Sequence, residues 1–317
     1  MSIAFGPVPS RRLGRSLGIN NIPPKLCTYS CIYCQLGPTR VMQYTPRKFY
    51  APERISSVVT AKVKKTQEMD EPIDYLTFVS DGEPTLDSSL GREIELLKPL
   101  GIKIGVITNG SLLWRSAVRN ILVKADWVSL KVDSTDEEVW REIDRPHKDL
   151  RLNSITEGML EFAKMYRGEL VTETMLVKDV NDNERHVEGV ADFLDLLKPH
   201  KAYLSIPTRP PAVSSVCPPD EKILIQSYHI VNKKVDCVEY LTGYEGSGFA
   251  FTGNIEEDLV SIGAVHPIRK DAVKHLLEKA KADWSTVQRL IDGGKLIEIA
   301  YEGTSFFMKK LPQAMGQ

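Results

Sequence analysis

The segment Lys25-Leu-Cys-Thr-Tyr-Ser-Cys-Ile-Tyr-Cys-Gln-Leu-Gly37 holds three of the five cysteines of this 317-residue chain, spaced C-x3-C-x2-C. Three thiolates this close together are able to hold three corners of an iron-sulfur cube. A structural zinc site needs four protein ligands, yet the first histidine is His147 and the next cysteine is Cys217. A disulfide scheme would leave one of the three thiols unpaired. The spacing therefore favours a cluster with one open iron over zinc or a disulfide.

The composition is that of an ordinary soluble globular protein, with 42% hydrophobic and 26% charged residues. We find no run of about 18 apolar residues, which argues against a membrane span. The first twenty residues lack the apolar core of an export signal, so we expect a cytoplasmic protein. The net charge of -1 excludes a protein that coats nucleic acid by bulk electrostatics, although a local basic patch remains open. Arg11, Arg12 and Arg15 are either such a patch or ordinary ion-pair partners.

Short β-branched runs alternate with helical stretches along the first two thirds of the chain, which is typical of βα units and a parallel sheet. We predict six such units. The expected strands cover residues 16–22, 74–80, 102–108, 127–133, 169–177 and 202–206. Sequence alone hardly separates an open sheet from a barrel.

The cysteine motif resembles the hallmark of the radical S-adenosylmethionine (radical SAM) superfamily, C-x3-C-x-aromatic-C, with Tyr33 as the aromatic residue. The run from Phe5 to Gly18 resembles the branch that includes the wyosine-base tRNA synthases and uncharacterised relatives. This resemblance implies a partial (β/α)6 TIM-type barrel in which Cys27, Cys31 and Cys34 ligate a [4Fe-4S] cluster.

The resemblance also implies a reaction. S-adenosyl-L-methionine (SAM) would bind the fourth iron through its amino and carboxylate groups. One electron, delivered by a donor such as flavodoxin or ferredoxin, would cleave the sulfonium to methionine and a 5′-deoxyadenosyl radical. That radical would take a hydrogen atom from a substrate. The difficult chemistry then belongs to the cofactors.

Further motifs follow the expected strands. Ser80-Asp-Gly-Glu-Pro-Thr85 resembles the Gly-Gly-Glu-Pro motif of the family, which makes Asp81, Gly82 and Glu83 candidate contacts of the SAM methionine. Asp81 replaces the first glycine of that motif, and a lone D-G-E-P is an ordinary turn. Asn109, at the end of the third strand, is a further candidate contact.

Ser129-Leu-Lys-Val-Asp133 resembles the Asp-Leu-Lys segment of glycyl-radical activating enzymes, with Ser129 where the acid would be. Strand alternation places Ser129, Lys131 and Asp133 on one face, and a lysine inside a barrel needs a partner or a ligand. Glu173 would bind ribose or substrate, or pair with Lys131. Ile206 is expected to pack against adenine. Arg209 either faces the cavity or simply belongs to an exit loop that the neighbouring prolines stiffen.

We divide the chain into a radical SAM partial barrel (residues 1–207), a connector covering the barrel (208–253) and a winged-helix-like domain (254–317). The last part shows three short helices, at 255–262, 270–281 and 285–291, and a hairpin at 296–308 that turns at Glu302-Gly303. Its excess of positive charge is small for a nucleic-acid reader. Cys217 and Cys237 are expected to be ordinary buried or surface thiols, and the alternative is that one of them donates hydrogen or reacts in the site.

Three functions are compatible with these sequence features. The branch resemblance favours modification of a tRNA base. The similarity to activating enzymes favours a protein or peptide substrate. A non-catalytic iron-sulfur sensor with a DNA-binding winged helix would need neither the D-G-E-P motif nor Lys131, so those motifs count against it.

Overall fold

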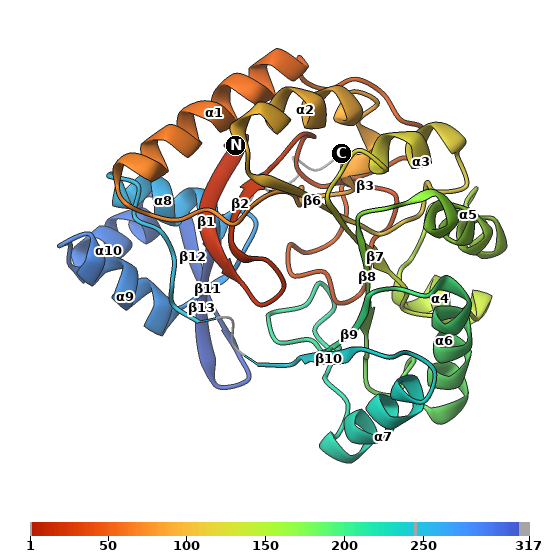
Figure 1. The fold of residues 1–317 in the computed structure, drawn as a ribbon. Helices are drawn as coiled ribbons and strands as arrows, with labels where there is room; N and C mark the ends of the chain where they lie inside the picture. The colour runs from red at the N-terminus through yellow and green to blue at the C-terminus, as the bar shows by residue number, and fades with distance from the viewer. Residues whose placement is uncertain (1, 244–245, 311–317) are drawn as a thin grey trace, which may run out of the picture.

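A computed structural model of the chain describes residues 2–243 and 246–310. Its main sheet has the strand order β1-β2-β5-β6-β7-β8-β9-β10 and curls into a partial TIM-type barrel (Figure 1). The six predicted strands are present, so the fold class is confirmed. They are β2 (Gly14–Ile19), β5 (Tyr75–Phe78), β6 (Lys103–Thr108), β7 (Trp127–Lys131), β8 (Glu169–Met175) and β9 (Lys201–Ser205).

Two further strands extend the sheet at its ends. β1 (Ala4–Ser10) pairs antiparallel with β2, and β10 (Val238–Leu241) pairs parallel with β9. Pro7 and Pro9 made β1 hard to predict, because proline is tolerated in a strand only at a sheet edge or a bulge. The segment 208–253, expected to cover the barrel, thus adds β10 and helix α7 (Glu221–Asn232) to the barrel.

Helices cover the outer face of the curled sheet (Figure 1). Side chains that alternate along each strand point outward and pack against them, among them Leu76, Val128 and Leu130, all fully buried. Two short elements, η1 (Pro84–Leu86) and η2 (Lys98–Leu100), are single turns of 3-10 helix. The covering helices are α1 (Pro52–Glu68), α2 (Leu90–Leu97), α3 (Ser116–Leu122), α4 (Glu137–Ile143), α5 (Leu152–Met165), α6 (Glu184–Leu197) and α7.

The barrel interior is filled by side chains at the end where the parallel strands begin. Leu13, from the turn between β1 and β2, packs with Trp127, Val171, Tyr203 and Leu241 in one buried cluster. These side chains fill part of the barrel interior, so a ligand approaches from the carboxyl ends of the strands, as in other TIM-type barrels.

The C-terminal part contains the three predicted helices and the predicted hairpin. The two strands of the hairpin form a sheet with a third strand, in the order β11-β13-β12. Residues 311–317 lie outside the described range. The assignment of this part as a winged helix stays a prediction. The elements are α8 (Ile255–Gly263), β11 (Ile268–Arg269), α9 (Lys270–Lys279), α10 (Trp284–Asp292), β12 (Leu296–Tyr301) and β13 (Thr304–Lys309).

This C-terminal part packs against the β1 edge of the barrel. Phe5 and Val8 of β1 belong to the same buried cluster as Leu259 and Ile262 of α8. Glu71 accepts ion pairs from Arg15 of the barrel and Lys279 of α9, so Arg15 has the structural role considered above. The sheet edge is thereby covered by protein.

We predict that Gly158→Ala in α5 lowers stability, although alanine normally favours a helix by about 1 kcal/mol. An added Cβ would lie 2.4 Å from the backbone carbon of Leu113 and 2.4 Å from the amide nitrogen of Trp114. Moving the backbone to relieve this clash costs free energy. We therefore expect the free energy of unfolding, measured in urea, to fall by about 1–3 kcal/mol. Gly189→Ala in α6 is the control, since its Cβ would meet only the Thr135 hydroxyl. Equal stability of the two variants would contradict the packing described for α5.

Candidate active site

A cavity of about 320 Å³ lies at the carboxyl ends of the barrel strands. Cys27, Cys31 and Cys34 line it together with most of the predicted cofactor contacts. Those contacts are Tyr33, Asp81, Gly82, Glu83, Asn109, Lys131, Glu173 and Ile206. Ser129 and Asp133, also predicted, are absent from the lining; Ser129 lies one inward-facing position below Lys131 and is buried.

The cysteine loop is fastened to the barrel by backbone pairing. β3 (Leu26–Cys27) pairs with β4 (Val41–Met42), and the amide of Lys25 donates to the carbonyl of Asp81 at 2.6 Å. The Lys25 ammonium is buried and donates to the carbonyl of Gly37 at 2.7 Å, which closes the loop on itself. Burial lowers the pKa of Lys25. The three thiols are thus held on a loop of defined shape.

The three thiols suit a cluster that takes one thiolate per iron. Burial, and then the Glu83 carboxylate, raise the pKa of Cys27 to about 12. Burial and then Asp144 likewise raise the pKa of Cys31. A bound metal centre would be needed to hold these groups as thiolates. Within the described residues no three His, Cys, Asp or Glu side chains are close enough to share one metal ion, and a cube does not require that, because its thiolates bind separate irons.

Gly82 allows the Asp81–Glu83 turn to lie against the cysteine-bearing strand. Its φ is +158°, and a Cβ there would stand 1.9 Å from the carbonyl oxygen of Leu26. The amide of Glu83 donates to that same oxygen at 3.2 Å. A glycine is required because two backbone segments touch at this point.

Glu83 ties the ends of β5 and β6 together. Its Oε1 accepts from the Thr85 amide (3.0 Å) and from the hydroxyls of Thr85 and Thr108 (2.6 Å each). Its Oε2 accepts from the Asn109 amide at 2.8 Å. Burial raises the pKa of this carboxyl, and the hydrogen bonds oppose that rise. The Asn109 side chain in turn donates to Thr28 at 2.7 Å and approaches the Cys27 sulfur at 3.7 Å, next to the cysteine loop.

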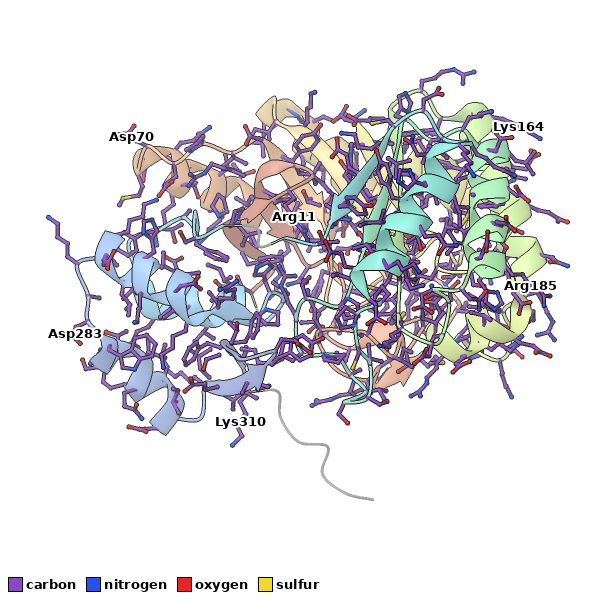
Figure 2. The ribbon with its side chains drawn as sticks, turned by 90° about the horizontal axis from the view of Figure 1, so that it is seen from below. Arg11, Asp70, Lys164, Arg185, Asp283 and Lys310 are labelled. Carbon is purple, nitrogen blue, oxygen red and sulfur yellow. The ribbon has the colours of Figure 1, made fainter. Side chains whose placement is uncertain are left out.

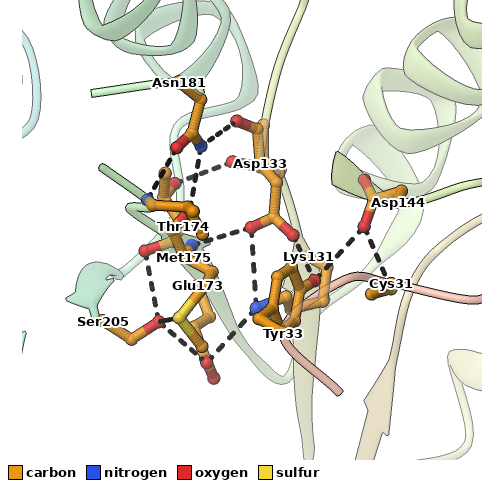
Figure 3. Close-up of polar contacts among 12 residues, drawn as sticks. Cys31, Tyr33, Lys131, Asp133, Asp144, Glu173, Thr174, Met175, Asn181 and Ser205 are labelled. Carbon is orange, nitrogen blue, oxygen red and sulfur yellow. Dashed lines mark hydrogen bonds and ion pairs between the residues drawn. The ribbon is translucent and has the colours of Figure 1, made fainter. Parts of the chain in front are cut away.

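Inside the barrel, Lys131 lies between two carboxylates (Figure 3). Its Nζ is 3.5 Å from Asp133 Oδ1 and 3.4 Å from Glu173 Oε1. Burial would lower the pKa of Lys131, but Asp133 and Glu173 outweigh it and the pKa is raised. Burial would raise the pKa of Glu173, yet Lys131 and Arg12 hold it at about 2. The expected pairing of Glu173 with Lys131 is therefore present, and both groups are charged at neutral pH.

The network reaches the cysteines through the predicted Tyr33 and Asp133 and through Asp144, which sequence reasoning missed (Figure 3). Tyr33 donates its hydroxyl to Asp133 and approaches Asp144 at 3.2 Å, and the Cys31 thiol donates to Asp144 at 3.1 Å. Burial and then Asp133 raise the pKa of Asp144. Asp144 follows α4 without any recognisable motif, so only the folded loop reveals its position.

Arginines of the β1–β2 turn also face the cavity. Arg11 and Arg12 line it, and Arg12 forms an ion pair with Glu173. The ring of Tyr33 lies 4.8 Å from the Lys131 nitrogen, in a cation–π contact. By contrast, Cys217 is exposed and Cys237 is half-buried, and neither lines the cavity.

The open barrel, its three converging cysteines and the D-G-E-P turn define a class of iron-sulfur enzyme that binds SAM. The family model of the radical SAM superfamily matches residues 21–194. The chain belongs to the radical SAM superfamily. Members of this family bind a [4Fe-4S] cluster and SAM, so the chain is a radical SAM enzyme. No helix among the described residues could cross a membrane.

The chain is also similar to individual proteins and to a solved structure. A UPF0026 protein of Methanocaldococcus jannaschii is 46% identical over 98% of this chain and 97% of its own length. An S-adenosylmethionine-dependent nucleotide dehydratase of Lacinutrix mariniflava is 23% identical over 55% of this chain and 35% of its own. The structure of TYW1 with a lysine-pyruvate adduct bound superposes with a TM-score of 0.51 and 17% identity, covering 70% of this chain and 74% of that one. This last likeness shows the barrel fold.

We expect Glu83→Ala to weaken SAM binding at least tenfold while iron content stays intact. The change leaves four buried donors of Thr85, Thr108 and Asn109 without their acceptor, which should also cost at least about 2 kcal/mol of stability. Equilibrium dialysis, iron analysis and urea unfolding measure the three quantities. Glu95→Ala removes an exposed carboxylate on α2 and serves as control. Loss of the cluster itself in Glu83→Ala would show a purely structural role.

Asp81 predicts a pH dependence of stability. Its side chain is 1% exposed, and burial raises its pKa from 3.8 to about 7, against the attraction of Lys25 and Arg40. The fold thus favours the neutral acid, so stability from this group is present below pH 4 and is lost as the pH rises toward 7. We expect Asp81→Asn to match the wild type near pH 4 and to exceed it at pH 8, by up to about 4 kcal/mol. Parallel stability curves for the two cluster-free proteins between pH 4 and 8 would contradict this.

Proposed function

We propose that this enzyme cleaves SAM reductively and uses the product radical to take hydrogen from a nucleobase-bearing substrate. The observation that carries the proposal is the convergence, in one cavity, of three cysteines, the Asp81–Glu83 turn and the buried Lys131. The bound cluster would supply one electron for cleavage of SAM to methionine and a 5′-deoxyadenosyl radical. A flavodoxin or ferredoxin is the proposed source of that electron.

The residues of the chain supply position and charge. Cys27, Cys31 and Cys34 would hold three irons. The turn at Asp81–Glu83 and the side chain of Asn109 shape the wall beside Cys27, where the methionine part of SAM would lie. Lys131 presents a positive charge that suits a carboxylate, and Glu173 and Asp133 hold it in place. Packed side chains close the other end of the barrel, which keeps water from reaching a reactive radical from that side.

The substrate class rests on two supports. The N-terminal segment resembles the branch with tRNA-modifying synthases, and one relative carries the name of a nucleotide dehydratase. A tRNA base and a free nucleotide are both nucleobase substrates, and a peptide substrate is the alternative. A non-catalytic sensor would have no use for a charged pair such as Lys131 and Glu173, which is costly to bury, beside a ligand-sized cavity.

The test is anaerobic reconstitution with iron and sulfide, followed by reductant and SAM. We expect 5′-deoxyadenosine and methionine in equal amounts. Cys27→Ala should lose at least 90% of the product, about tenfold, while Cys237→Ala, which changes a thiol outside the cavity, should retain it. A fully loaded wild-type protein that neither forms 5′-deoxyadenosine nor binds SAM would contradict the proposal. Stimulation of product formation by tRNA, nucleotides or peptides then ranks the substrate classes.

A further inference from the structure

A second cavity, of about 260 Å³, lies where the barrel meets the C-terminal domain. The barrel contributes the loop after β9, and the domain contributes the segments around α8, β11 and the β12–β13 hairpin. Pro207, Thr208 and Arg209 line both this cavity and the first one. The two cavities therefore adjoin along these three residues.

The shared segment Pro207–Arg209 is hydrogen-bonded both to the C-terminal domain and to the cysteine loop. The hydroxyl of Tyr301, in the domain, donates to the carbonyl of Pro207 at 3.2 Å. Arg209 donates to the Gln35 side chain at 2.6 Å and lies 3.1 Å from His266 Nε2. Gln35 directly follows Cys34, and its side-chain Nε2 donates to the carbonyl of Val265 at 3.2 Å. The shared segment, in the loop after β9, thus connects the cysteine loop with the C-terminal domain.

The lining of the second cavity combines positive charge with ring surfaces. Arg209 and Arg269 contribute guanidinium groups and His266 an imidazole ring, and Glu302, whose side chain is exposed, is the acid among the lining residues that the structure describes. The Arg269 Nε lies 3.2 Å from Asp271, outside the lining. Phe249 and Phe306 are buried and form the apolar part. Guanidinium groups bind phosphate through paired hydrogen bonds, so the donors suit an anion with several oxygens.

The volumes of the two cavities indicate which part of a substrate each one could hold. Ligand pockets commonly measure about 300–1,000 Å³, so the first cavity, at about 320 Å³, lies at the lower end of that range. A substrate must still reach the reactive carbon. The second cavity is the adjoining space for the rest of it. A tRNA would instead need a long basic surface, and the chain has 41 Lys and Arg against 42 Asp and Glu.

We propose that the second cavity is the outer half of the substrate site and binds the phosphate group of a small nucleotide-like molecule, whose reacting carbon lies in the first cavity. This inference rests on the proposed function, and it names the substrate class. It assigns the C-terminal domain a direct part in substrate binding, with Arg269 as its phosphate contact and Arg209 as the contact from the barrel.

The experiment measures binding of the four common nucleoside 5′-monophosphates and of the matching nucleosides to the reconstituted, SAM-loaded protein by calorimetry. At least one monophosphate should bind tenfold or more tightly than its nucleoside. Arg269→Gln should reduce that advantage at least tenfold, since it removes a charge-assisted contact. Arg185→Gln is the control, because Arg185 is exposed on α6, far from the domain that carries Asp283 and Lys310 (Figure 2).

A second pair of variants isolates charge from folding. Thr304 lines the cavity at the start of β13. Thr304→Glu should bind the monophosphate at least tenfold more weakly than Thr304→Gln, which has the same size but no charge. Equal binding by these two variants, or no advantage of any monophosphate over its nucleoside, would overturn the inference. Preferential binding of tRNA with a steep salt dependence would overturn it too.

Different results would overturn the proposed function and the phosphate-binding inference. Formation of 5′-deoxyadenosine by the wild type reports on the proposed function and needs no substrate. Product formation without any phosphate preference would overturn the inference alone. Absence of both product and SAM binding would overturn the proposed function, whatever the calorimetry shows.

Discussion

The interior of this barrel depends on how the ammonium group of Lys131 is compensated. A buried cation is tolerated only beside groups of opposite charge, and here Asp133 and Glu173 lie 3.5 and 3.4 Å from it. Glu173 in turn pairs with Arg12 of the β1–β2 turn. Asp133 accepts from Tyr33, and the amide of Met175 donates to it at 2.7 Å. One network therefore connects strands β7 and β8, the turn that closes the barrel, and the cysteine loop.

Much of this arrangement could be predicted from the sequence, because parallel strands bring their carboxyl ends to one edge. Cysteines after β2, a D-G-E-P turn after β5 and an asparagine after β6 had to meet there. Contacts that depend on the shape of a loop could not be predicted from the sequence. Asp144 touches Cys31 only because the loop after α4 returns to the cysteine segment, where the amide of Ser30 donates to its carbonyl at 3.0 Å. Likewise, Glu83 has a positioning role that its motif did not reveal, since its acceptors are already used by Thr85, Thr108 and Asn109.

The C-terminal domain is more than an appendage to the barrel. Its cluster of apolar side chains includes Phe5 and Val8 of β1, so barrel and domain share a core. Lys62 of α1 donates to Thr252 at 2.8 Å and pairs with Asp258 at 3.3 Å, adding a polar contact to the same junction. The junction also places Val265 next to Gln35 of the cysteine loop. The domain is thus anchored beside the site where we propose that substrate enters.

The central claim is that Cys27, Cys31 and Cys34 hold a cluster with one iron left for SAM. Electron paramagnetic resonance of the reduced, reconstituted protein with and without SAM tests it most directly. Our account predicts about four irons per chain and a spectrum that changes when SAM is added, because the cofactor becomes a ligand of the open iron. A spectrum that is identical with and without saturating SAM would contradict it.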